Sequence, residues 1–191
     1  NIFNDETVGG EAKKLHNDAL AMIDDIVKNK TLQAKGVMGI WPANAVGDDI
    51  EVYAPDGSGA KLGTFHTLRQ QEEREDATYY ALSDFVAPKA SGKTDYIGAF
   101  AVSAGFGCED VCAELRRQND DYKGIMMEAV ADRLAEAFAE LLHYKMRTEL
   151  WGYAPDEKVD IDNLLKVKYT GIRPAPGYPT QPDHTEKNFL G

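Results

Sequence analysis

The stretch that decides the fold is DDIEVYAPDGSGAKLGTFHT, residues 48–67. Residues 50–53 within it, Ile-Glu-Val-Tyr, are typical of a strand that opens after Asp48 and Asp49. The run 55–59 predicts a turn, because proline presets φ and glycine accepts positive φ. A second strand over 60–67 would then pair antiparallel with the first as a hairpin. An antiparallel hairpin favours the α+β class over a strictly alternating α/β fold.

Two more strands flank this hairpin in the chain. Residues 36–41 predict a buried strand, which we expect Pro42-Ala43-Asn44 to end. Residues 95–104 predict another strand, since they are rich in aromatic and β-branched side chains. The charged run 70–76 is expected to be a solvated helix or loop.

Helical periodicity fills much of the remaining chain. Apolar residues recur at helical spacing over 11–29 and over about 122–151, which would be the longest helix. A shorter helix starts with Glu109-Asp110 and ends with Arg116-Arg117, charges that suit the helix dipole. A short helical segment is predicted over 160–168. We therefore expect an α+β fold in which long helices pack on an antiparallel sheet.

The charge of the chain limits its partners. Among 191 residues, 21 are basic and 32 acidic, which gives a formal net charge of −11. Nucleic acids and anionic membranes would approach against this field, so neither is an expected partner. With 43% hydrophobic residues the chain can form one sizeable core, and we expect a single domain over 1–191.

Compartment and metal chemistry follow from the termini and the cysteines. The N-terminus is polar and acidic, unlike a signal peptide, and no apolar run is long enough for a membrane span. A cytoplasmic protein with reduced Cys108 and Cys112 is therefore expected. The two thiols could share a helical face, but no further ligands stand near them in sequence, so no metal site is predicted.

Two residues stand out as binding candidates. Asp84 lies in an apolar segment, where an ionised carboxylate needs a cation or several donors; a helix or turn cap and a functional role are both open. Arg173 begins RPAPGYP (173–179), a segment too rich in proline and glycine for a helix or a central strand. Prolines restrain this backbone, which would help the guanidinium grip a carboxylate; a plain connector is the competing interpretation.

Two further positions are weaker candidates. Tyr178 follows Gly177, where another molecule can approach the backbone closely; the ring could stack on a purine or pack in the core. Glu136 lies near Arg133 and Glu140 on the long helix, and a solvated face is its ordinary interpretation. No activated nucleophile or positioned base is visible. The residues suggest a site for a ligand with an ammonium and a carboxylate.

The chain resembles the reactivation domain of cobalamin-dependent methionine synthase. The segment 173–179 matches that family's Arg-x-x-x-Gly-Tyr consensus for S-adenosylmethionine. Further matches follow in family order over about 35–187. They are WPAN (41–44), VGDDI (46–50), LRQQ (68–71), LSDFVAP (82–88), YIGAFAV (96–102), ADRLAEAFAE (131–140) and WGYAP (151–155).

This resemblance implies a domain that binds S-adenosylmethionine and supplies its methyl group to reactivate oxidised cobalamin, within a methyltransferase of methionine biosynthesis. Cobalamin would sit on a neighbouring domain, zinc only in another domain of the parent enzyme, and a flavodoxin or flavodoxin-like reductase would give one electron. The methyl passes directly from sulfonium to cobalt, so no catalytic side chain is implied.

The resemblance also implies roles for single residues. Arg173 would pair with the ligand's carboxylate, while Asp84 and Glu136 would meet its ammonium-bearing end. Tyr178 and the backbone of Ala175 and Gly177 would line the pocket. The resemblance therefore implies six ligand-binding residues and no metal-binding residue.

Two departures from the family pattern stand in the sequence. Gln181 replaces the family's cysteine in GYPTQPDH (177–184), so no redox or ligand role is implied there. The family domain also continues beyond the region matched here, so we expect a fragment of a longer multidomain enzyme. The alternative function is a non-catalytic interaction module of the same fold that docks on a cobalamin domain or a flavodoxin-like partner.

Overall fold

The computed structural model describes residues 2–73, 75, 78–158 and 160–190. The chain forms two compact units, one of Asn1–Val37 with Ala101–Lys145 and the other of Met38–Phe100 with Met146–Gly191. The boundary passes through the two longest strands, β1 (Gln33–Val46) and β4 (Asp95–Phe106). The expectation of a single domain stays a prediction.

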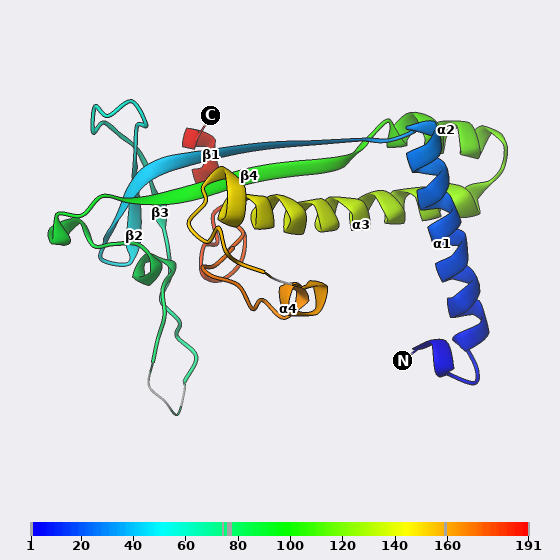
Figure 1. Ribbon diagram of the computed structural model, residues 1–191, viewed down its shortest axis with the longest axis horizontal. Helices are drawn as coiled ribbons and strands as arrows, with labels where there is room; N and C mark the ends of the chain where they lie inside the picture. Colours follow the sequence, from blue (N-terminus) through cyan, green and yellow to red (C-terminus); the bar gives the residue numbers. More distant parts are fainter. Residues whose placement is uncertain (1, 74, 76–77, 159, 191) are drawn as a thin grey trace. The chain divides into compact units, whose positions relative to one another are not determined.

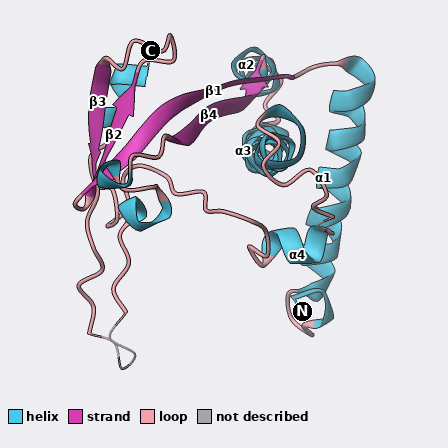
Figure 2. Ribbon diagram, turned by 60° about the vertical axis from the view of Figure 1, so that its left-hand side comes forward, coloured by secondary structure: helices cyan, strands magenta, loops and turns pink. Residues whose placement is uncertain are grey.

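The first unit is mostly helical. It contains the short 3-10 turn η1 (Ile2–Asn4) and the helices α1 (Gly9–Asn29), α2 (Cys108–Arg117) and α3 (Asp121–Lys145). Figure 2 shows α2 beside α3. The helices bury apolar side chains at helical spacing, as the sequence predicts. The buried cluster comprises Ile26, Cys112, Met126, Met127 and Val130.

The sheet follows the order β3-β2-β1-β4 (Figure 1). β2 (Asp49–Tyr53) pairs antiparallel with both β1 and β3 (Lys61–His66), which confirms the predicted hairpin and the α+β class. The register places Ile50 opposite Ala45 on one side and Phe65 on the other. The second unit's buried cluster comprises Ala43, Ala45, Ile50 and Val86, with Phe65, Leu82 and Ile97 packed against it.

The two largest differences from the predicted boundaries are at the ends of β1 and of the longest helix. β1 does not stop at Pro42 but continues to Val46. The ladder with β2 begins only at Ala43, so the missing N–H of Pro42 removes no hydrogen bond from it. The longest helix ends at Lys145 rather than near Trp151, because a π-helical turn, η4 (Met146–Leu150), replaces its expected last turn.

Short elements and loops complete the second unit. They are the 3-10 turns η2 (Leu82–Phe85), η3 (Lys89–Ser91) and η5 (Glu186–Leu190) and the helix α4 (Ile161–Leu165), which is shorter than the predicted 160–168. The charged run 70–76 lies in a loop where it is described; Arg74 and Asp76 lie outside the described residues. Across the described helices, none is long and apolar enough to cross a bilayer.

Candidate functional site

The proline-rich segment forms an irregular loop that closes in a tight turn. Tyr178 and Gln181 form an isolated antiparallel bridge. The Gly177 N–H donates to the Gln181 carbonyl at 2.7 Å, and the Gln181 N–H donates to the Tyr178 carbonyl at 2.9 Å. Gln181 is buried beneath the turn, whereas the Tyr178 side chain is 65% exposed. The turn therefore holds its backbone rigidly and leaves an aromatic ring available.

Gly177 is required by this turn for two reasons. Its φ of +96° lies in the left-handed region, which strains a residue with a side chain. A Cβ at this position would also overlap the imidazole ring of His184. His184 thus packs directly against the backbone that precedes Tyr178.

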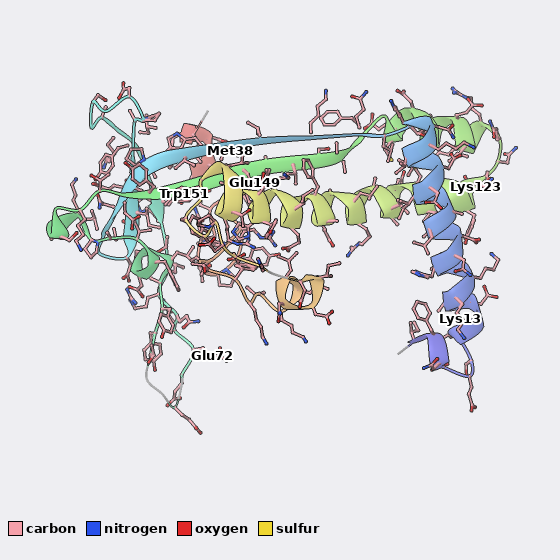
Figure 3. The ribbon with its side chains drawn as sticks, viewed as in Figure 1. Lys13, Met38, Glu72, Lys123, Glu149 and Trp151 are labelled. Carbon is pink, nitrogen blue, oxygen red and sulfur yellow. The ribbon has the colours of Figure 1, made fainter. Side chains whose placement is uncertain are left out.

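The turn is joined to a second segment, residues 68–72, which follows β3. The Leu68 N–H donates to the Thr180 carbonyl at 2.9 Å. Together the two segments line a groove of about 500 Å³, whose walls are Leu68, Arg69, Gln70, Gln71, Glu72, Tyr178, Pro179 and Thr180. Figure 3 marks Glu72 on this loop.

Arg69 connects the groove to Asp84. Its guanidinium binds the Asp84 carboxylate through both nitrogens, Nη1 to Oδ2 at 2.6 Å and Nη2 to Oδ1 at 2.9 Å. Nη2 also donates to Asp48 at 2.6 Å, and Nη1 donates to the Tyr79 carbonyl at 2.7 Å. With one arginine against two carboxylates, this cluster is net negative at neutral pH. It would attract a cationic ligand group.

Asp84 also accepts the Ala81 N–H at 2.9 Å, at the start of η2. The cap left open by the sequence is therefore present, and the ion pair with Arg69 accompanies it. The hydrogen bonds from Arg69, more than that from Ala81, lower the pKa of Asp84 to about 2. The carboxylate is thus ionised at neutral pH.

The structure brings only some of the predicted site residues to one place. Tyr178 lines the groove, and Asp84 reaches it through Arg69. Arg173 is half-buried and Ala175 exposed in the same loop, but neither Arg173, Ala175 nor Gly177 lines the groove. Glu136 belongs to the other unit, where it is exposed on α3 and pairs with Arg133 at 2.8 Å.

The role of Arg69 is not evident from the sequence. The LRQQ motif (68–71) matches the family pattern, but nothing in its spacing indicates that Arg69 lies against Asp84, 15 residues later. A signal did exist, because a carboxylate in an apolar segment needs a cation.

The cysteines do not form part of a described metal site. The Sγ atoms of Cys108 and Cys112 lie 3.8 Å apart, unlinked. Burial is the main cause that raises the pKa of Cys108 to about 11, so its thiol is protonated at neutral pH. Over the described part of the chain, no group of three His, Cys, Asp or Glu could hold a metal ion.

The chain is similar to one protein family and to solved structures. The family model "Vitamin B12 dependent methionine synthase, activation domain" matches residues 1–191. The chain is also similar to the solved crystal structure of the MetH reactivation domain bound to AdoHcy, with 51% sequence identity and a TM-score of 0.89. That similarity covers 99% of this chain but only 58% of the solved chain.

Proposed function

Because the chain belongs to the activation-domain family of vitamin B12-dependent methionine synthase, we propose that it binds S-adenosylmethionine and presents the methyl group for reactivation of cobalamin. The observation that carries the proposal is the RPAPGYP loop, whose Tyr178 lines a groove beside the net negative cluster of Asp48, Arg69 and Asp84. The relative bound to AdoHcy supports the same ligand class, since AdoHcy differs from S-adenosylmethionine by one methyl group.

The charge of the ligand fits the residues of the second unit. S-adenosylmethionine carries a sulfonium, an ammonium and a carboxylate. A carboxylate such as that of Asp84 has about four lone-pair sites, and Arg69 and Ala81 use three of them. One site on Oδ1 is left for the ligand's ammonium. We assign the ligand's carboxylate to Arg173; a contact between Glu136 and the ammonium stays a prediction of the family resemblance.

Positioning is the whole contribution that these residues make to the chemistry. Tyr178 and the backbone of Ala175 and Gly177 would hold the nucleoside end, while Arg173 and Asp84 would hold the amino-acid end. The sulfonium methyl is then fixed between two anchored ends, which raises its effective concentration at the acceptor. Cobalamin, carried by a neighbouring domain, would accept the methyl group after one electron from a flavodoxin or flavodoxin-like reductase.

Titration calorimetry of the 191-residue chain with S-adenosylmethionine tests this function. We expect saturable binding, and Arg173→Ala should weaken it by about 2 kcal/mol or more, the value of a lost charge-assisted pair. Arg117→Ala is the matched control, because Arg117 is an exposed arginine that pairs only locally with Glu114. An unchanged Kd in Arg173→Ala would remove Arg173 from the site.

A folded chain that gives no heat with S-adenosylmethionine would contradict the proposal. That outcome would support the alternative, a non-catalytic module that docks on a cobalamin domain or a flavodoxin-like partner. Titration of the same sample with an isolated cobalamin domain would then test the alternative directly.

A further inference from the structure

A buried ion pair lies at the beginning of the segment that leads to Arg173. The Arg147 side chain is 0% exposed and its partner Glu157 only 10%. Both Nε and Nη2 of Arg147 reach Oε1 of Glu157, at 2.9 and 2.7 Å. Burying two charges costs desolvation, so such a pair is poorly explained by stability alone. Arg147 also lies in the π-helical turn η4, a type of irregularity that is frequent at functional sites.

The Arg147–Glu157 pair also contacts the backbone of Thr170, 13 residues after Glu157. Oε2 of Glu157 accepts the backbone N–H of Thr170 at 3.1 Å. The Arg147 guanidinium lies over the Tyr169 ring, 4.2 Å from its centroid. Two successive residues in an irregular segment are therefore fixed by one buried pair.

Tyr153 holds the same point from another direction. Its hydroxyl donates to the Thr170 carbonyl at 3.3 Å. Burial raises the pKa of Tyr153 above its ordinary value, so the hydroxyl remains protonated and able to donate at neutral pH. The Tyr153 ring packs edge-on against Trp151, with 5.1 Å between the ring centroids. Trp151, labelled in Figure 3, directly follows η4.

Gly171 completes the arrangement. It adopts a φ of +91°, and a Cβ there would come within 2.9 Å of the Tyr153 hydroxyl. Side chains thus hold both backbone polar groups of Thr170, and the next residue must be glycine. Only Ile172 separates this anchored point from Arg173, whose own backbone is restricted by Pro174.

We propose that Arg147, Glu157 and Tyr153 are positioning residues for Arg173, fixing residues 169–171 so that the guanidinium of Arg173 is preorganised for a carboxylate. The inference rests on the proposed function in one respect, the assignment of the ligand's carboxylate to Arg173. A ligand then binds without having to order this segment, which removes an entropic cost from binding.

Two variants test the positioning role. Glu157→Gln keeps the shape of the side chain but removes its charge, and Tyr153→Phe removes one hydroxyl from a side chain that is 41% exposed. We expect the Kd for S-adenosylmethionine to rise about tenfold in Glu157→Gln and about threefold in Tyr153→Phe, as small displacements of a binding group do. Amide hydrogen exchange at Thr170 and Gly171 should accelerate more than exchange in the sheet of the same unit.

Glu51→Gln is the matched control. Glu51 is also a largely buried carboxylate of the second unit, 17% exposed, and binds Lys61, Lys89 and Tyr53 away from this segment. Its substitution should destabilise the unit without changing the Kd or the exchange at Thr170. That contrast separates positioning from a general loss of stability.

The outcomes distinguish this inference from the proposed function. If the wild-type chain binds S-adenosylmethionine and folded Glu157→Gln and Tyr153→Phe bind it equally well, the positioning role is overturned and the function stands. If the wild type does not bind, the function fails, and exchange at Thr170 in the ligand-free protein still decides the positioning role. Should Glu157→Gln not fold, Tyr153→Phe carries the test, because it leaves the buried pair intact.

Discussion

At the scale of single residues, the structural role of Asp84 is compatible with the binding role proposed for it. Its carboxylate caps η2, forms a bidentate ion pair with Arg69 and still has one acceptor site left. Capping and ligand binding are therefore compatible, since they use different lone pairs of the same carboxylate. The hydrogen bonds from Arg69 keep the Asp84 carboxylate ionised at neutral pH and hold it in position.

Asp84 should contribute to stability in a pH-dependent way. Its pKa is lowered from 3.8 to about 2 in the folded chain, so its contribution is present above about pH 4 and is lost as the pH falls through 2. Asp84→Asn should therefore be less stable than wild type at pH 7, and the difference should shrink toward pH 2. Urea unfolding at a series of pH values measures it, with Asp24→Asn on α1 as the control; a constant difference down to pH 2 would refute the assignment.

Gly177 should be sensitive to the smallest substitution. Gly177→Ala forces a Cβ into the left-handed region and onto the His184 ring, which should cost about 1–2 kcal/mol of unfolding free energy. Gly57→Ala is the control, because Gly57 has a φ of +78° but open space around its Cβ. Thermal unfolding of both, and of Gly177→Ala combined with His184→Ala, separates overlap from backbone strain. Equal losses in the two single variants would show that His184 exerts no steric constraint.

At the scale of elements, the C-terminal turn η5 protects β3, the strand at one edge of the sheet. Both Glu186 oxygens accept the His66 N–H at 3.1 Å, so an edge donor is satisfied. The centroid of the Phe189 ring lies 4.8 Å from that of Phe65, and the ring occupies the space that a side chain at residue 63 would need. Covering an edge in this way prevents its pairing with another chain.

Loss of the Phe189 ring should expose this edge. Phe189 is half-buried, so Phe189→Ala should lower the unfolding free energy by about 2 kcal/mol, less than for a fully buried ring. Phe85→Ala is the control, since Phe85 is 53% exposed and the centroid of its ring lies 6.4 Å from that of Tyr80. Denaturant midpoints compare the two, and faster proteolysis near the C-terminus should accompany the first. If Phe189→Ala costs no more than Phe85→Ala, η5 does not anchor the edge.

At the scale of the whole molecule, the net charge of −11 has a specific consequence for ligand binding. S-adenosylmethionine carries a net positive charge, so the field of the protein should favour its approach. The same field should repel a flavodoxin, which is usually acidic. Any such electron donor would have to dock through a local basic patch, through the cobalamin domain, or through shape.

Salt should therefore weaken the binding of S-adenosylmethionine. Raising the salt concentration from about 0.02 to 0.5 M should increase the Kd roughly threefold, because the Debye length falls well below the dimensions of the protein. S-adenosylhomocysteine provides the control, since it lacks the sulfonium charge and should bind with little salt dependence. Calorimetry with both ligands measures the effect. Equal salt dependence would exclude long-range attraction as its cause.

The sequence by itself determined most of the elements and, through the family resemblance, the ligand class that we propose. Helical periodicity in α1 and the turn at 55–59 are local signals. The RPAPGYP motif is contiguous. None of the three needs knowledge of the remaining chain. The extension of β1 past Pro42 could not be predicted, because it depends on where the ladder with β2 begins. Only the three-dimensional register decides whether a proline removes a bond.

The tertiary structure alone decided how the candidate residues are supported. Arg69 meets Asp84 across 15 residues, and Glu157 meets Thr170 across 13, at separations with no sequence period. Contacts of this kind arise when the chain folds back on itself and buried charges must find partners. The sequence names candidate residues for a zwitterionic ligand, and folding determines which neighbours hold them in place.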